Sequence, residues 1–160
     1  MFKPDEVRSV FPEGIFGGPI APDAIATAER LLGHALPEQL RTLYLAFDGF
    51  RGPGDALFLL PLLKRPSPNE SLVSYTLFFR GEDYAPVWLR QAIVLGDNGA
   101  GVGWFMLLDQ GCRLVRWDAE WEEYEPVGGS LLDAWLRERD SLAPAATGVS
   151  PERRGATTAP

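Results

Sequence analysis

A segment dense in glycine, residues 93–109, constrains the fold of this chain more than any other stretch. It reads IVLGDNGAGVGWFMLLD, with glycine at positions 96, 99, 101 and 103 between two apolar runs. Glycine adopts positive φ at little steric cost, and an Asn-Gly pair between apolar runs is typical of a hairpin turn. The segment therefore predicts two antiparallel strands joined by a tight turn.

The same glycines do not fit a phosphate-binding loop. A dinucleotide-binding loop opens a helix whose N-terminus holds the pyrophosphate, whereas these glycines precede an apolar run typical of a strand. A Walker loop needs Gly-Lys-Ser or Gly-Lys-Thr, and neither follows here. We therefore expect the glycines to serve backbone geometry alone, with no cofactor.

Two amphipathic helices are predicted upstream of this hairpin. The first ends at Gly33, and its apolar face is formed by Ile25, Ala28, Leu31 and Leu32. The second begins at Pro37 and closes at Gly49, and its apolar face is formed by Leu40, Leu43, Tyr44 and Phe47. Both should pack on a sheet.

Further elements follow from the same kind of pattern. Residues 56–62 are short and apolar and predict a buried strand. A third helix is expected over residues 69–81, capped by Asn69, with an inner side formed by Leu72, Tyr75, Thr76 and Phe79. Residues 112–117 predict another strand, and residues 120–127 can add one more. Ser130 and Asp133 form a capping box before a last amphipathic helix, whose apolar residues are Leu131, Leu132, Trp135 and Leu136.

The order of these elements predicts a single α+β domain, with a mostly antiparallel sheet of about four to six strands and helices packed on it. We expect residues 1–24 to form an N-terminal arm that packs on the domain, and residues 25–142 to form the domain itself. Residues 143–160 carry almost no large aliphatic side chains, so we expect a disordered tail.

Charge and composition narrow the function. The formal net charge is −7, which argues against nucleic acid as a direct ligand and favours a basic partner. Apolar runs are too short to span a bilayer, and charged residues interrupt the N-terminus where a secretory signal would need an apolar core. We therefore expect a cytoplasmic protein without a membrane partner. The oligomeric state is left open.

Residues suited to catalysis are scarce. The only histidine, His34, falls on a predicted turn, and the single cysteine, Cys112, is interpreted as a small packing residue at the start of a strand. One histidine and one cysteine leave zinc without a ligand set, so no metal site is expected. Neighbouring carboxylates on one strand are not placed across a sugar-sized cleft as a glycosidase requires. We therefore predict no enzymatic activity and no catalytic residues.

The acidic segment WDAEWEEYE, residues 117–125, is the candidate partner-binding site. In an extended chain Asp118, Glu120 and Glu122 would share one face. Such charges either protect a solvated sheet edge from aggregation or form a docking surface for a basic protein. The candidate contact residues, which include the hairpin turn, are Asp97, Asp118, Glu120, Trp121, Glu122, Glu123 and Glu125. Trp117, Trp121 and Tyr124 can anchor an interface or belong to the core.

The segments LLGHALPEQLRTLYLAFDGF, LFLLPL, IVLGDNGAGVGWFMLLD and VRWDAEWEEYEPVGGSLLDAWL, taken together, resemble the SUKH superfamily of SMI/KNR-type domains. The resemblance runs from about residue 25 to residue 136. It implies an α+β fold with a mostly antiparallel sheet. Many bacterial members resemble immunity proteins that bind and neutralise toxins, often nucleases, and no catalytic residue carries over.

The resemblance and the charge together predict a non-enzymatic, intracellular, protein-binding module. The favoured hypothesis is an immunity protein that neutralises a cognate toxin, for example a nuclease, through an acidic face. The alternative is a regulatory or scaffold protein of the same family with no toxin partner. A carboxylate-dependent enzyme is a distant third hypothesis.

Overall fold

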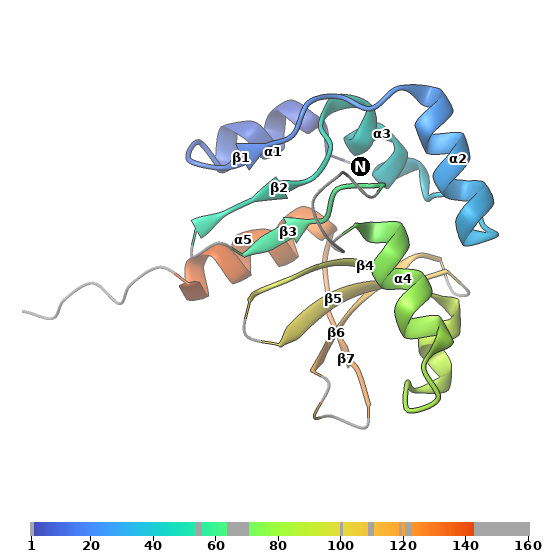
Figure 1. The fold of residues 1–160 in the computed structure, drawn as a ribbon. Helices are drawn as coiled ribbons and strands as arrows, with labels where there is room; N and C mark the ends of the chain where they lie inside the picture. The colour runs from blue at the N-terminus through green and yellow to red at the C-terminus, as the bar shows by residue number, and fades with distance from the viewer. Residues whose placement is uncertain are drawn as a thin grey trace, which may run out of the picture.

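The computed structural model describes residues 2–53, 56–63, 71–99, 101–108, 111–118, 120 and 123–142. Seven strands form one antiparallel sheet in sequence order, with helices on its two faces (Figure 1). The strands are β1 (Ile15–Phe16), β2 (Phe50–Arg51), β3 (Leu57–Leu59), β4 (Ala92–Asp97), β5 (Val102–Leu107), β6 (Arg113–Asp118) and β7 (Glu125–Pro126). The helices are α1 (Pro4–Val10), α2 (Pro22–Leu32), α3 (Glu38–Ala46), α4 (Leu72–Gly81), the short 3-10 helix η2 (Val87–Gln91) and α5 (Leu131–Leu142).

This architecture confirms the α+β class and the antiparallel sheet. The sheet has seven strands, one more than the upper end of the predicted range. The two strands that the sequence did not predict individually are β1 and β2. They have two residues each and are too short to show an alternating pattern. The strand expected over residues 56–62 is confined to the three residues of β3, and the one expected over residues 120–127 is confined to the two residues of β7.

The helices upstream of the hairpin follow the predicted spacing with one exception. Gly33 ends α2 with a φ of 70°, and Ile25, Ala28 and Leu32 are buried. Leu31 is 50% exposed, so its predicted place on the inner face is wrong. The buried stripe is narrower than the sequence suggests and leaves Leu31 at its margin.

Helix α3 confirms its predicted core face, because Leu40, Leu43, Tyr44 and Phe47 are all fully buried. The hydroxyl of Tyr44 donates a hydrogen bond to the Leu60 carbonyl oxygen at 2.7 Å. Burial raises the pKa of Tyr44 well above its usual value, and the nearby charge of Asp48 raises it further. Tyr44 therefore stays neutral and ties α3 to the segment that follows β3.

Helix α4 begins later than predicted. Its N-cap is Ser71, whose Oγ accepts a hydrogen bond from the Ser74 backbone N–H at 3.1 Å, while the Ser71 N–H donates to Ser74 Oγ at 3.0 Å. This reciprocal capping replaces the cap expected at Asn69, a residue that lies outside the described part of the chain. The inner side is as predicted, with Thr76 buried and Phe79 packed against the core.

The N-terminal segment packs against the C-terminal helix, α5. Phe2 and Phe11 are buried, and the Phe2 ring lies 6.1 Å from the Trp135 ring of α5. From α5, Arg139 Nη1 donates a hydrogen bond to the Val10 carbonyl oxygen at 2.8 Å, and its guanidinium lies 5.5 Å from the centre of the Phe11 ring. Helices α1 and α5 therefore hold each other in place.

A ladder of aromatic rings crosses the face of the sheet that α5 covers, formed by Phe16, Phe50, Phe58 and Trp104. Successive centroids lie 5.0, 5.4 and 5.7 Å apart, with interplanar angles of 16°, 7° and 13°. The last step passes over β4 at Gly96, where a Cβ atom would lie 1.9 Å from the Leu57 carbonyl oxygen. Only glycine allows β3 to approach β4 this closely.

The predicted hairpin is confirmed as β4 and β5. Their register runs from Ala92 opposite Leu107 to Asp97 opposite Gly103. In the turn, Gly99 and Gly101 have φ values of 75° and 94°, a region that side chains other than glycine rarely adopt. The hairpin lies against α4 on one face of the sheet, opposite the face of the aromatic ladder.

Candidate functional site

The candidate acidic residues are carried by two connections at the same end of the sheet. In register, Asp97 of β4 pairs with Gly103 of β5, and Asp118 of β6 pairs with Val102. The β4–β5 turn and the β6–β7 connection therefore leave the sheet at one end. We call Asp97, Asp118, Glu120 and Glu123 the acidic end.

Two of these carboxylates also shape the backbone that carries them. Asp97 Oδ1 accepts a hydrogen bond from the Gly99 N–H at 2.7 Å, and Asp118 Oδ1 accepts one from the Glu120 N–H at 2.9 Å. Both side chains are half-buried, whereas Glu120 and Glu123 are exposed. Asp97 and Asp118 are thus held in fixed positions, and the two glutamates extend into solvent.

The acidic segment is not one extended strand. Strand β6 ends at Asp118, Glu120 lies in a turn, and β7 begins only at Glu125. The expected common face of Asp118, Glu120 and Glu122 on a single strand is therefore wrong, because the chain reverses between β6 and β7. Trp121 and Glu122 lie outside the described residues.

The aromatic residues of this segment belong to the core where the structure describes them. Trp117 is 3% exposed and lies 5.8 Å from the Trp88 ring of η2. Tyr124 is half-buried, with its ring 5.0 Å from that of Trp88. Neither residue projects from the surface as an interface anchor would.

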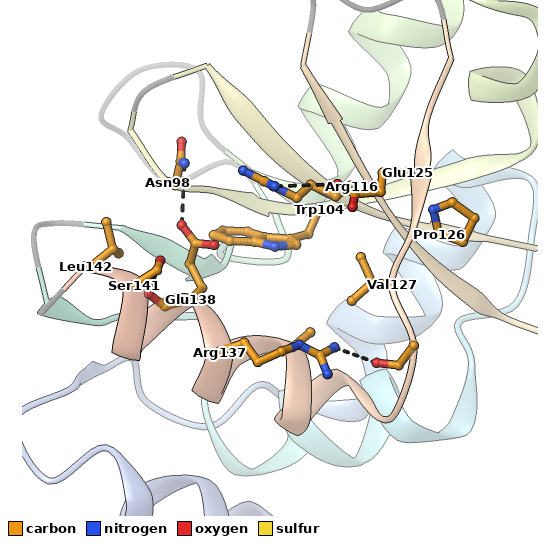
Figure 2. Close-up of a pocket in the computed structure, with 12 residues that line it drawn as sticks. Asn98, Trp104, Arg116, Glu125, Pro126, Val127, Arg137, Glu138, Ser141 and Leu142 are labelled. Atoms are coloured by element: carbon orange, nitrogen blue, oxygen red, sulfur yellow. Dashed lines mark hydrogen bonds and ion pairs between the residues drawn. The ribbon is translucent and has the colours of Figure 1, made fainter.

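A groove of about 530 Å³ lies between α5 and strands β5–β7, and we call it the α5 groove. Figure 2 shows the indole of Trp104 between the Arg116 side chain and helix α5. Arg116 forms an ion pair with Glu125 of β7, with Nη1 and Oε2 3.5 Å apart. The charge of Glu125 is thus compensated by Arg116, so Glu125 is not counted in the acidic end.

The other polar groups of the α5 groove also bond to each other. Asn98 Nδ2 donates to Glu138 Oε1 at 3.5 Å, which links the hairpin turn to α5. Arg137 donates to the Gly128 carbonyl oxygen, as the second dashed contact near α5 shows (Figure 2). These contacts fix the walls of the groove.

The capping box predicted at the start of α5 is confirmed and anchors one wall of the groove. The Ser130 N–H and hydroxyl both donate to Asp133 Oδ2, at 2.7 and 2.8 Å, and the Asp133 N–H donates to Ser130 Oγ at 3.2 Å. These hydrogen bonds from Ser130 lower the pKa of Asp133 because they stabilise its ionised form.

Residues that sequence reasoning weighed for catalysis lie apart from these features. His34 is exposed beside Gly33 at the end of α2, as predicted for a turn residue. Cys112 is exposed with a φ of 59° in the β5–β6 turn, so its predicted role as a packing residue is wrong. Among the described residues, no group of three or more His, Cys, Asp or Glu side chains is placed to hold a metal ion.

The family assignment follows from a comparison with protein-family models. The model of the SMI1 / KNR4 family (SUKH-1) matches residues 19–138, three quarters of the chain. The chain belongs to this family. The match to SUKH-1 spans α2 through β7 and most of α5, so it contains the acidic end and most of the residues that line the α5 groove. A comparison with curated proteins found no match.

Within the part of this SUKH-1 chain that the structure describes, every helix is too short or too polar to cross a membrane.

A second hollow, on the α4 face of the sheet, is lined by the glycine-rich hairpin and by aromatic side chains of α4, β5 and β6. Sequence reasoning missed this hollow, although glycines at strand positions are a known sign of close approach by a partner.

Proposed function

We propose that this SUKH-1 protein is an immunity protein that binds and neutralises a basic protein toxin through its acidic end. The observation that carries the proposal is the gathering of four carboxylates, on two connections, at one end of the sheet. The superfamily resemblance implies the same role. Binding without catalysis is sufficient for neutralisation, because a bound partner loses access to its substrate.

Charge supplies the physical reason for such a partner. A nuclease grips phosphate through clustered Lys and Arg side chains, and carboxylates held at one end of a rigid sheet present a comparable set of negative charges. The net charge of −7 also attracts a basic protein over long range. The encounter takes place in the cytoplasm, where a nuclease toxin meets its nucleic acid.

The direct test is growth rescue. Each protein encoded beside the gene for this chain is expressed alone and together with the chain in a sensitive host. We expect one of them to arrest growth alone and to lose that effect when the chain is present. Failure of the chain to rescue growth from any toxic neighbour would contradict the immunity role and favour the regulatory alternative.

The acidic end is tested on the toxin found in this way. The Glu120→Lys, Glu123→Lys variant should associate at least about tenfold more slowly at low salt, with a weaker salt dependence. The free energy of unfolding should change by only a few tenths of a kcal/mol per residue, because exposed charges contribute little to folding. Stopped-flow fluorescence gives the association rate, and urea denaturation gives the stability.

A matched control separates local from overall charge. The Glu38→Lys, Asp83→Lys variant makes the same change in net charge at two exposed residues outside the acidic end. Asp83 follows α4, whose last turn lies beside the first residue of β4, at the opposite end of the sheet. An equal loss of rate in both variants would show that net charge, and not the acidic end, governs the encounter.

A further inference from the structure

The second hollow lies on the α4 face of the sheet, beside the β4–β5 turn. It measures about 270 Å³, and we call it the glycine slot. Its apolar lining includes Tyr75 and Phe79 from α4, Phe105 from β5 and Trp117 from β6. Asp97 of the acidic end also lines it, so the slot opens at the end of the sheet where the proposed partner would dock.

Two glycines of the β4–β5 turn contribute only backbone to the rim of the slot. Gly99 and Gly101 are exposed, and a Cβ atom on either would meet nothing within 4 Å. At Gly103, inside the slot, a Cβ atom would lie 2.8 Å from the Phe105 ring. The turn therefore needs glycine for its backbone geometry, and the same glycines keep side chains away from the mouth of the slot.

The aromatic lining is rigid. The rings of Phe79, Phe105 and Trp117 pack edge to face, with centroids 5.8 to 6.0 Å apart and interplanar angles of 72° to 85°. Phe105 and Trp117 are 2% and 3% exposed, so they form the floor, and the half-buried Phe79 forms a wall. A site held in this way needs little ordering when a ligand enters.

We propose that the glycine slot binds the side chain of an arginine presented by a protein partner. This inference rests on the proposed function, because it assigns one anchor of the basic partner. The aromatic rings suit the flat faces of a guanidinium and its apolar stem, and the Asp97 carboxylate at the rim suits its charge. Arginine fits better than lysine, whose compact ammonium is more strongly hydrated.

Size and surroundings favour a single side chain over a small-molecule ligand. Pockets for drug-sized ligands and cofactors have volumes of roughly 300 to 1,000 Å³, and the slot falls below that range. Phe78, which is 52% exposed, packs against Phe79 with ring centroids 5.4 Å apart. It extends the aromatic surface beyond the slot, where neighbouring residues of a protein partner would lie.

The test uses N-acetyl-arginine amide as the probe and the isolated full chain. Titration followed by ¹H–¹⁵N NMR should give saturable shifts at the amides of Gly99, Gly101 and Gly103 and at the Trp117 indole N–H. N-acetyl-citrulline amide, which has nearly the same shape without the charge, should bind about tenfold more weakly. N-acetyl-lysine amide should bind more weakly than the arginine probe.

A conservative variant tests the carboxylate. Asp97→Asn keeps an oxygen that accepts the Gly99 N–H hydrogen bond and removes the charge, so the turn should persist while arginine binding weakens severalfold. Asp83→Asn makes the same change in charge on an exposed residue at the opposite end of the sheet and should bind as the unmodified protein does. NMR spectra of both variants verify that the fold is retained.

Several results would overturn the inference. Absence of saturable shifts, shifts confined to other residues, or equal binding of the citrulline probe would each do so. Tighter binding of N-acetyl-leucine amide would assign the slot to an apolar side chain instead. Because no toxin is needed, arginine binding without growth rescue would refute only the proposed function, and rescue without arginine binding would refute only this inference.

Discussion

The α5 groove and the glycine slot lie on opposite faces of one sheet and both reach the β4–β5 turn. The groove is about twice as large, at 530 against 270 Å³. The polar side chains of its walls bond to each other, as in the Arg116–Glu125 and Asn98–Glu138 contacts. The slot is lined by rings and bare glycines. The proposal of a binding site in the slot therefore rests on the groups that each hollow leaves for a partner to contact, and not on its volume.

The largest effect we expect comes from a pair of glycine variants that separates the close approach of β3 to β4, at Gly96, from the β4–β5 turn, at Gly99. Gly96→Ala places a Cβ atom 1.9 Å from the Leu57 carbonyl oxygen and should cost about 3 kcal/mol or more. Gly99→Ala meets no neighbour and carries only the strain of its φ of 75°, which is worth about 1 to 2 kcal/mol. Urea denaturation measures both values.

The order of those two losses is the informative result. A larger loss for Gly99→Ala would mean that the turn, and not the approach of β3 to β4, limits stability at this end of the sheet. The close approach of β3 to β4 would then contribute less to the free energy of unfolding than the glycine turn does.

A smaller effect is expected at the start of α5, in the pH dependence of the free energy of unfolding. The pKa of Asp133 is lower in the folded chain than in the unfolded chain. The ionised carboxylate therefore contributes its full stabilisation of the helix cap above the unfolded pKa, at about pH 4. That contribution is lost as the pH falls through the folded value. The gap in unfolding free energy between the unmodified protein and Asp133→Asn should therefore narrow on acidification.

The control for this measurement is Asp83→Asn, which alters an exposed carboxylate away from α5. Its stability should follow that of the unmodified protein at each pH. A constant gap for Asp133→Asn between neutral and acid pH would show that the capping hydrogen bonds do not depend on ionisation.

The smallest effect is expected from removing the predicted tail. Ser141 and Leu142 line the α5 groove, and residues 143–160 follow them in the sequence. Val149 is the one large aliphatic residue of that segment, and a chain ending at Leu142 should melt within a few degrees of the full chain. Differential scanning calorimetry compares the two. A much larger loss would mean that the tail packs on the domain, for example over the groove.

Sequence patterns predicted the elements whose residues interact locally. Helix α3 was predicted because four buried residues follow one helical period, and the β4–β5 hairpin because its turn needs positive φ. The short strands β1 and β2 were not predicted, because two residues are too few to show an alternating pattern of apolar and polar side chains. Asp97 was a candidate from its place in the turn, but the slot beside it depends on Phe79 and Trp117, which only the folded sheet brings together.

The bond between Arg139 and Val10 also bears on when this chain can finish folding during synthesis. The strands pair in sequence order, so each can join the edge left by the one before it as the chain leaves the ribosome. Helix α1, by contrast, makes some of its contacts with α5, which follows all of these strands in the sequence. Until residues 131–142 emerge, Phe2 lacks its partner Trp135. Helix α1 can therefore dock on α3 first, where Arg8 donates a hydrogen bond to the Ala46 carbonyl oxygen, and its contacts with α5 form later.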